Sequence, residues 1–136
     1  MDKYSDLLKK HGLKVTPQRL EMVTQLDVNG HMSIDKIYEI LLLKYPSISL
    51  ATIYKNINSM LEKLFVREVK IPNRKSVYEL SKEYHSHLVC KKCNEVMDIS
   101  IDINKFIDEV EEKNDYKISE TNLVFLGTCN KCSKNI

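Results

Sequence analysis

The chain has 136 residues, of which 43% are apolar and 29% are charged, with three glycines, three prolines, no tryptophan and four cysteines. A chain of this length buries only about two thirds of its unfolded surface, so we expect one or two small domains that need a metal or a second subunit for stability. The longest aliphatic run covers residues 40–43 and the N-terminus carries acids, which argues against a membrane span and a signal peptide and favours a cytoplasmic protein.

Charge is distributed unevenly along the chain. Residues 1–82 hold 14 Lys and Arg against 9 Asp and Glu, whereas residues 83–136 hold 7 against 10, so the two halves carry net charges of +5 and −3. A basic half suits contact with a polyanion, and the acidic half then has a different role. A solvated surface gives the same net charge in many domains, so charge alone leaves both interpretations open.

Consecutive capped helices are predicted in the first half. Apolar residues recur at helical spacing over residues 3–11, 17–27 and 34–45. Thr16 is suited to cap the second helix, with Pro17 in its first turn, and Ser33 is suited to cap the third. The predicted stops are residues that do not continue a helix: Gly12, Asn29-Gly30 and Tyr45-Pro46.

A fourth helix is predicted to begin at Ser49, and its two faces differ. One face is an apolar stripe of Leu50, Ile53, Ile57, Met60, Leu61 and Leu64. The other carries Ala51, Thr52, Lys55, Asn56 and Ser59, with Tyr54 at the margin. No acid occurs before Glu62, although an exposed helix ordinarily mixes Glu with Lys, so this face is compatible with DNA. A helix that is merely polar on its surface is the alternative.

A basic β-hairpin follows this helix. Residues 65–71 and 75–80 are β-prone and are separated by Pro72-Asn73-Arg74. Three helices and a basic hairpin in this order indicate a winged helix-turn-helix, in which the last helix enters the major groove. Lys70, Arg74 and Lys75 are the candidate phosphate contacts of the hairpin tip.

The second half predicts a small α+β unit joined through a hinge at residues 81–84. His85, His87 and Val89 share one side of a strand, and residues 96–101 form its hairpin partner. Asp102 is expected to cap a helix over residues 103–110, and residues 116–126 are expected to form one long final strand.

The four cysteines form two C-x-x-C pairs, Cys90 with Cys93 and Cys129 with Cys132. Two such pairs supply a tetrahedral thiolate set, and zinc is the metal that such a site usually holds. Zinc would also supply the stability that a small domain lacks. A redox dithiol is the alternative, but it needs only one pair, commonly at the start of a helix, and neither pair precedes a predicted helix.

A second set of ligand-type residues mixes nitrogen and oxygen donors. Strand alternation places His85 and His87 on one face, with Glu79 before them and Asp98 after them, and His31 precedes the third helix. Three imidazoles and two carboxylates suit ferrous iron, manganese or zinc. His31 taken alone is more often an ordinary loop histidine, and periodicity does not bring it to the others. His11 is interpreted as structural.

Several segments together resemble the ferric-uptake-regulator family of bacterial metal-dependent repressors. They are Thr16-Pro17-Gln18-Arg19, the helix start from Ser49 to Asn56, and His85-x-His87-x-x-Cys90-x-x-Cys93 with the terminal Cys-x-x-Cys. The resemblance implies a winged-helix domain over residues 1–82 and a C-terminal α/β dimerisation domain over 83–136 with a structural zinc at the cysteines. It also implies a homodimer that represses transcription from an A/T-rich inverted-repeat operator.

The resemblance further implies the residues of each site. The regulatory ion, Fe(II) or Mn(II), would be held by His31, Glu79, His85, His87 and Asp98. The expected DNA contacts are Lys14, Arg19, Ala51, Thr52, Tyr54, Lys55, Asn56, Arg74 and Lys75. Lys55 stands where the family has arginine, so it keeps the charge but not the bidentate reach to guanine.

The small number of histidines before the first cysteine indicates the branch of the family. Iron-uptake and zinc-uptake members often carry a longer histidine-rich run before the first cysteine, which this chain lacks. The set with Asp98 resembles the peroxide-sensing branch, in which His31 and His85 would be the oxidation-sensitive positions. Glu79 departs from the aspartate that is typical there, so an iron-uptake repressor remains the alternative. A metallohydrolase would need a substrate cleft and a general base, and the chain shows no motif for either, so we expect no enzyme.

Overall fold

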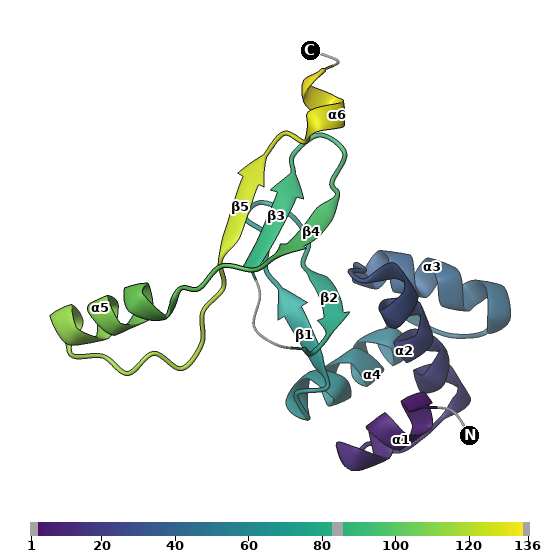
Figure 1. The fold of residues 1–136 in the computed structure, drawn as a ribbon. Helices are drawn as coiled ribbons and strands as arrows, with labels where there is room; N and C mark the ends of the chain where they lie inside the picture. The colour runs from purple at the N-terminus through teal and green to yellow at the C-terminus, as the bar shows by residue number, and fades with distance from the viewer. Residues whose placement is uncertain (1–2, 83–85, 135–136) are drawn as a thin grey trace. The chain divides into compact units, whose positions relative to one another are not determined.

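The computed structural model describes residues 3–82 and 86–134, and the chain divides into two compact units, Met1–Lys82 and Glu83–Ile136. The first unit contains α1 (Lys3–Lys10), α2 (Pro17–Asn29), α3 (Ile34–Lys44), α4 (Leu50–Glu62), β1 (Val66–Val69) and β2 (Val77–Leu80). The second contains β3 (Ser86–Cys90), β4 (Val96–Ile99), α5 (Asn104–Asn114), β5 (Val124–Gly127) and α6 (Asn130–Ser133) (Figure 1). The predicted α+β class is confirmed. No described helix has both the length and the apolar character that a membrane span requires.

Side-chain caps begin three helices of the first unit where the sequence predicts them. Thr16 Oγ1 accepts a hydrogen bond from the backbone N–H of Arg19 at 3.1 Å. Ser33 and Ser49 accept equivalent bonds in the first turns of α3 and α4, at 3.2 and 3.1 Å. Each cap satisfies an N–H that the helix itself leaves without an acceptor.

The buried face of α4 is narrower than the predicted apolar stripe. Ile53, Asn56, Ile57 and Met60 are its buried residues, which are the positions i, i+3, i+4 and i+7 of one helical face. Asn56 is only 9% exposed, so its predicted place on the outer face is wrong. Leu64 is 76% exposed because it lies beyond the helix end with φ at 58°, and the predicted stripe therefore ends before it.

The hairpin of β1 and β2 gains a third segment from the loop before α3. The two strands pair antiparallel, with Val66 opposite Leu80, and are shorter than predicted. Met32 and Tyr78 form an antiparallel bridge in which each backbone N–H donates to the other residue's carbonyl, at 3.0 and 2.7 Å. This register places position 31 beside position 79.

The second unit is built on a three-stranded sheet in the order β4-β3-β5, with β4 antiparallel and β5 parallel to β3. The predicted strand over residues 116–126 is wrong, because only Val124–Gly127 pairs with the sheet. Asp102 does not occupy the cap position, which is Ile103, although its carboxylate accepts a hydrogen bond from the Asn104 N–H at 3.0 Å.

This second unit has little interior of its own. Among residues 86–134 the buried ones are Ser86, His87, Val89 and Cys90, and α5 has no buried residue. Figure 1 shows α5 standing off from the end of the sheet instead of packing across it. The unit therefore lacks the apolar burial that usually stabilises a domain of this size.

Candidate metal centres and DNA-binding face

The four cysteines meet at one end of the three-stranded sheet. The Sγ atoms of Cys90, Cys93, Cys129 and Cys132 all lie within 4.8 Å of one another. Strand pairing brings them together, because Cys90 at the end of β3 is opposite Gly127 of β5, and Cys129 follows two residues later. Two cysteine pairs that lie more than 30 residues apart in the chain thus form a single cluster.

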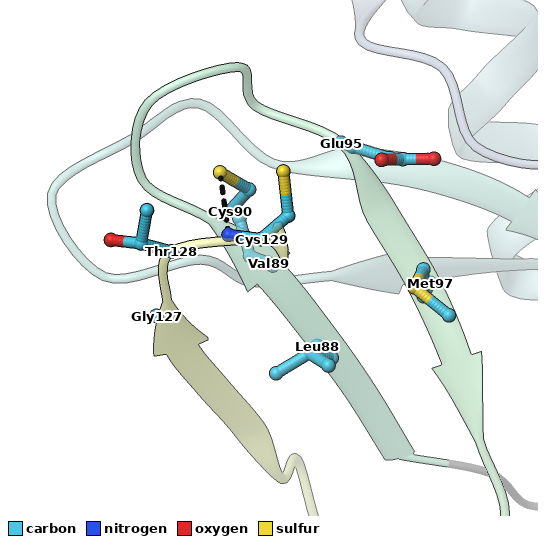
Figure 2. A pocket seen from close by; sticks show the side chains of 8 residues that line it. All are labelled: Leu88, Val89, Cys90, Glu95, Met97, Gly127, Thr128 and Cys129. Atoms are coloured by element: carbon cyan, nitrogen blue, oxygen red, sulfur yellow. Dashed lines mark hydrogen bonds between the residues drawn. The ribbon is translucent and has the colours of Figure 1, made fainter. Parts of the chain in front are cut away.

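Backbone donors hold the geometry of this cluster. Cys90 Sγ accepts hydrogen bonds from the backbone N–H groups of Cys93 and Cys129 at 3.5 and 3.3 Å, and Figure 2 draws the second bond. The one-turn helix α6 begins directly after Cys129 and contains Cys132, so the prediction that neither pair stands at the start of a helix is wrong for the second pair. The convergence of all four sulfurs is therefore the stronger argument for a metal site over a redox dithiol.

The cysteines differ in how readily they ionise. Hydrogen bonds from the backbone N–H groups of Cys93 and then Cys129 lower the pKa of Cys90 to about 6. Hydrogen bonding with Cys129, together with burial, raises the pKa of Cys132 to about 12. Four adjacent thiolates repel one another, and a divalent cation removes that cost. Soft sulfur donors in a set of four match zinc, so the residues fit the metal that the sequence predicts.

In the first unit, an imidazole and a carboxylate are paired. The bridge at Met32 and Tyr78 sets His31 against Glu79, and His31 Nε2 lies 2.8 Å from Glu79 Oε2. Glu79 is fully buried and the His31 side chain is 11% exposed. Burying a carboxylate is costly unless a donor or a cation compensates it, so this pair is suited to share a metal ion.

In the second unit, a similar pair results from strand register. His87 on β3 is directly opposite Asp98 on β4, and His87 Nε2 lies 3.6 Å from Asp98 Oδ1. His87 is 3% exposed. Each unit thus offers one nitrogen and one oxygen donor of the type that ferrous iron and manganese accept. His85, the fifth predicted ligand, lies outside the described residues.

The outer face of α4 carries four of the predicted DNA contacts. Ala51, Tyr54 and Lys55 are exposed, Tyr54 to 46%, and Thr52 is half-buried. Lys14 and Arg74 are also exposed. These residues are accessible to a duplex.

Other predicted contacts have protein partners. Lys75 Nζ forms an ion pair with Asp35 of α3, and its hydrogen bond and charge raise the pKa of Lys75. Arg19 donates from Nε to Asn56 Oδ1. The sequence could not reveal Asp35 as a partner, because no local spacing relates positions 35 and 75.

Comparison with known proteins identifies the relatives of this chain. The model of the ferric uptake regulator family matches residues 10–126. The ferric uptake regulation protein of Neisseria meningitidis serogroup C is 34% identical over 97% of this chain and 96% of its own length. A Campylobacter jejuni peroxide stress regulator structure is 36% identical over 97% of this chain and 100% of its own, with a TM-score of 0.73. The Vibrio cholerae ferric uptake regulator structure is 34% identical over 93% and 100%, with a TM-score of 0.75.

Proposed function

The chain belongs to the ferric uptake regulator family of metal-dependent transcriptional regulators, and from this premise we propose that it is a homodimeric repressor that senses peroxide through a bound ferrous iron, with manganese as an alternative corepressor. The observation that carries the proposal is the histidine–carboxylate pair in each unit, His31 with the buried Glu79 and the buried His87 with Asp98. An iron-uptake repressor that responds to the level of ferrous iron is the alternative within the same family.

The regulatory ion would take ligands from both units: His31, Glu79, His85, His87 and Asp98. Ligands carried by two units can bind one ion only in arrangements that bring them together. Metal occupancy therefore selects one arrangement, and with it one spacing of the recognition helices in the dimer. The effect is limited by the preference of the ion for that arrangement, and about 1.4 kcal/mol of preference changes the ratio of the two states tenfold.

The response to peroxide would be a single modification of the protein, not a turnover. When bound, ferrous iron supplies a reactivity toward peroxide that manganese lacks. His31 and His85 are the proposed targets, and the imidazole ring gains one oxygen atom while the other oxygen of peroxide leaves as water. A modified ring is a poorer ligand, so the protein would lose its metal and release DNA.

The dimer would form through the apolar groove of the second unit. α5 and the segment that leads into β5 line this groove with Ile103, Phe106, Ile107, Val110, Ile118, Leu123 and Phe125. Phe106 is 64% exposed, and α5 has no buried residue. An apolar surface of this kind on a unit with few buried residues favours a second copy of the chain as its cover.

The dimer would present two copies of α4 to successive major-groove segments of an A/T-rich inverted repeat. Twofold symmetry in the protein matches the symmetry of such an operator. Tyr54 and Lys55 would meet base edges, while Lys14 and Arg74 would meet phosphates.

Gel-shift titrations would test the proposal and separate the two branches. Zinc-loaded protein is titrated onto operator DNA with Fe(II) or with Mn(II), and each complex is then exposed to hydrogen peroxide. We expect both metals to promote binding and peroxide to release only the ferrous form. Equal insensitivity of the two forms would refute peroxide sensing and favour the iron-uptake alternative.

A further inference from the structure

Arg19 connects three segments of the first unit. It lies in the first turn of α2 and is half-buried. Its Nη1 donates to the backbone carbonyl of Lys14, in the loop after α1, at 2.8 Å, and its Nε donates to Asn56 Oδ1 on α4 at 3.2 Å. One guanidinium therefore links that loop, α2 and the recognition helix.

Asn56 has both ends of its amide in use. Oδ1 accepts from Arg19, and Nδ2 donates to the Thr52 carbonyl one turn earlier in α4, at 2.9 Å. An asparagine reads adenine by presenting its amide N–H and its amide oxygen together, and in Asn56 both groups are directed at protein partners. Its 9% exposure also places it on the inner face of α4.

We infer that Arg19 and Asn56 are positioning residues, which fix the exposed Lys14 and the outer face of α4 in one mutual geometry for DNA binding. The inference rests on the proposed function and assigns these two predicted DNA contacts a different role. The chemistry of arginine suits the role, because its planar guanidinium donates in fixed directions to two acceptors at once. A lysine keeps the charge but cannot reproduce the fork.

A positioning role and a direct phosphate contact differ in their dependence on salt. Loss of one phosphate contact reduces the slope of log affinity against log salt by about 0.9. Loss of the hydrogen bond between Arg19 and Asn56 leaves the number of phosphate contacts at saturation unchanged, so affinity falls while the salt slope stays the same. This hydrogen bond also couples the two residues, so once either side chain is removed, replacing the other should weaken DNA binding no further.

The test uses the full-length, zinc- and manganese-loaded protein and a duplex selected by the wild type from a random-sequence pool. The variants are Arg19→Lys, Arg19→Gln, Asn56→Ala and the double variant Arg19→Gln with Asn56→Ala. Lys14→Ala is the matched control for a phosphate contact. DNA affinity is measured at several salt concentrations, and a thermal melt of each protein gives the folded fraction.

We expect Arg19→Lys and Arg19→Gln to weaken binding by a similar factor, about tenfold, with the wild-type salt slope. The double variant should be no weaker than Arg19→Gln, and Lys14→Ala should flatten the slope. Any of four results would overturn the inference. They are wild-type affinity in Arg19→Lys, a flatter slope in Arg19→Gln, additive effects in the double variant, and a lowered melting temperature with unchanged affinity. Failure of the wild type to bind any duplex would refute the proposed function instead.

Discussion

Replacing Phe106 by alanine should weaken the dimer strongly. A phenylalanine side chain offers about 200 Å² of surface, so the 64% exposure of Phe106 leaves roughly 130 Å² for a partner to cover. At about 25 cal/mol per Å², full coverage contributes about 3 kcal/mol per protomer, and a twofold interface counts the residue twice. Because alanine retains part of this contact, we expect the dimer dissociation constant to rise by about two to four orders of magnitude.

Sedimentation velocity over a wide range of protein concentrations measures this constant. Lys105→Ala provides the matched control, because Lys105 is an exposed neighbour of Phe106 on the same helix. Zinc content and far-UV circular dichroism confirm that each variant is folded. If Phe106→Ala dimerises as tightly as the wild type and Lys105→Ala, the α5 groove is not the dimer interface and the reasoning is wrong.

Three further perturbations probe other parts of the structure. Cys132→Ser should lose zinc and unfold the second unit while the first stays folded. The second unit has few buried residues, and structural zinc sites contribute on the order of 10 kcal/mol. Hydrogen exchange of the two units would detect this unfolding, and full protection of residues 86–134 without zinc would contradict it. Asp35→Asn should release Lys75 from its ion pair and strengthen DNA binding a few-fold at low salt. An anisotropy titration would measure this change. An unchanged affinity would mean that the ion pair does not compete with phosphate. Tyr4→Phe removes the hydrogen bond that lowers the Asp27 pKa. A lowered folded-state pKa stabilises the folded protein above the unfolded value near 4, and this stabilisation is lost as pH falls. Urea unfolding should therefore show a stability difference between variant and wild type at pH 7 that shrinks toward pH 2, and a difference independent of pH would refute the assignment.

Features set by neighbouring residues could be predicted from the sequence. Thr16, Ser33 and Ser49 are small oxygen-bearing residues placed directly before helices, and each accepts the expected bond. The two C-x-x-C pairs are similarly informative, because four converging thiolates are the ligand set that zinc prefers. Local stereochemistry and ligand chemistry determine these features, so one sequence is enough.

Features set by pairing between distant segments could not be predicted. The place of His31 beside Glu79 depends on the bridge of Met32 with Tyr78, and no periodicity encodes that register. Asn56 is a polar residue on the buried face of α4, and its hydrogen-bond partner Arg19 is 37 positions away, so no local pattern relates the two. The final strand was overestimated because apolar residues near 118–123 line an open groove and do not pair with the sheet.

The metal dependence of operator binding tests whether ligands from both units bind one ion that controls DNA affinity. The measurement is the change in DNA affinity of zinc-loaded protein on addition of Mn(II), for the wild type and for His31→Ala. We predict an increase of about tenfold or more for the wild type, and no increase for His31→Ala at equal zinc content and melting temperature. An identical manganese response in the two proteins would contradict it.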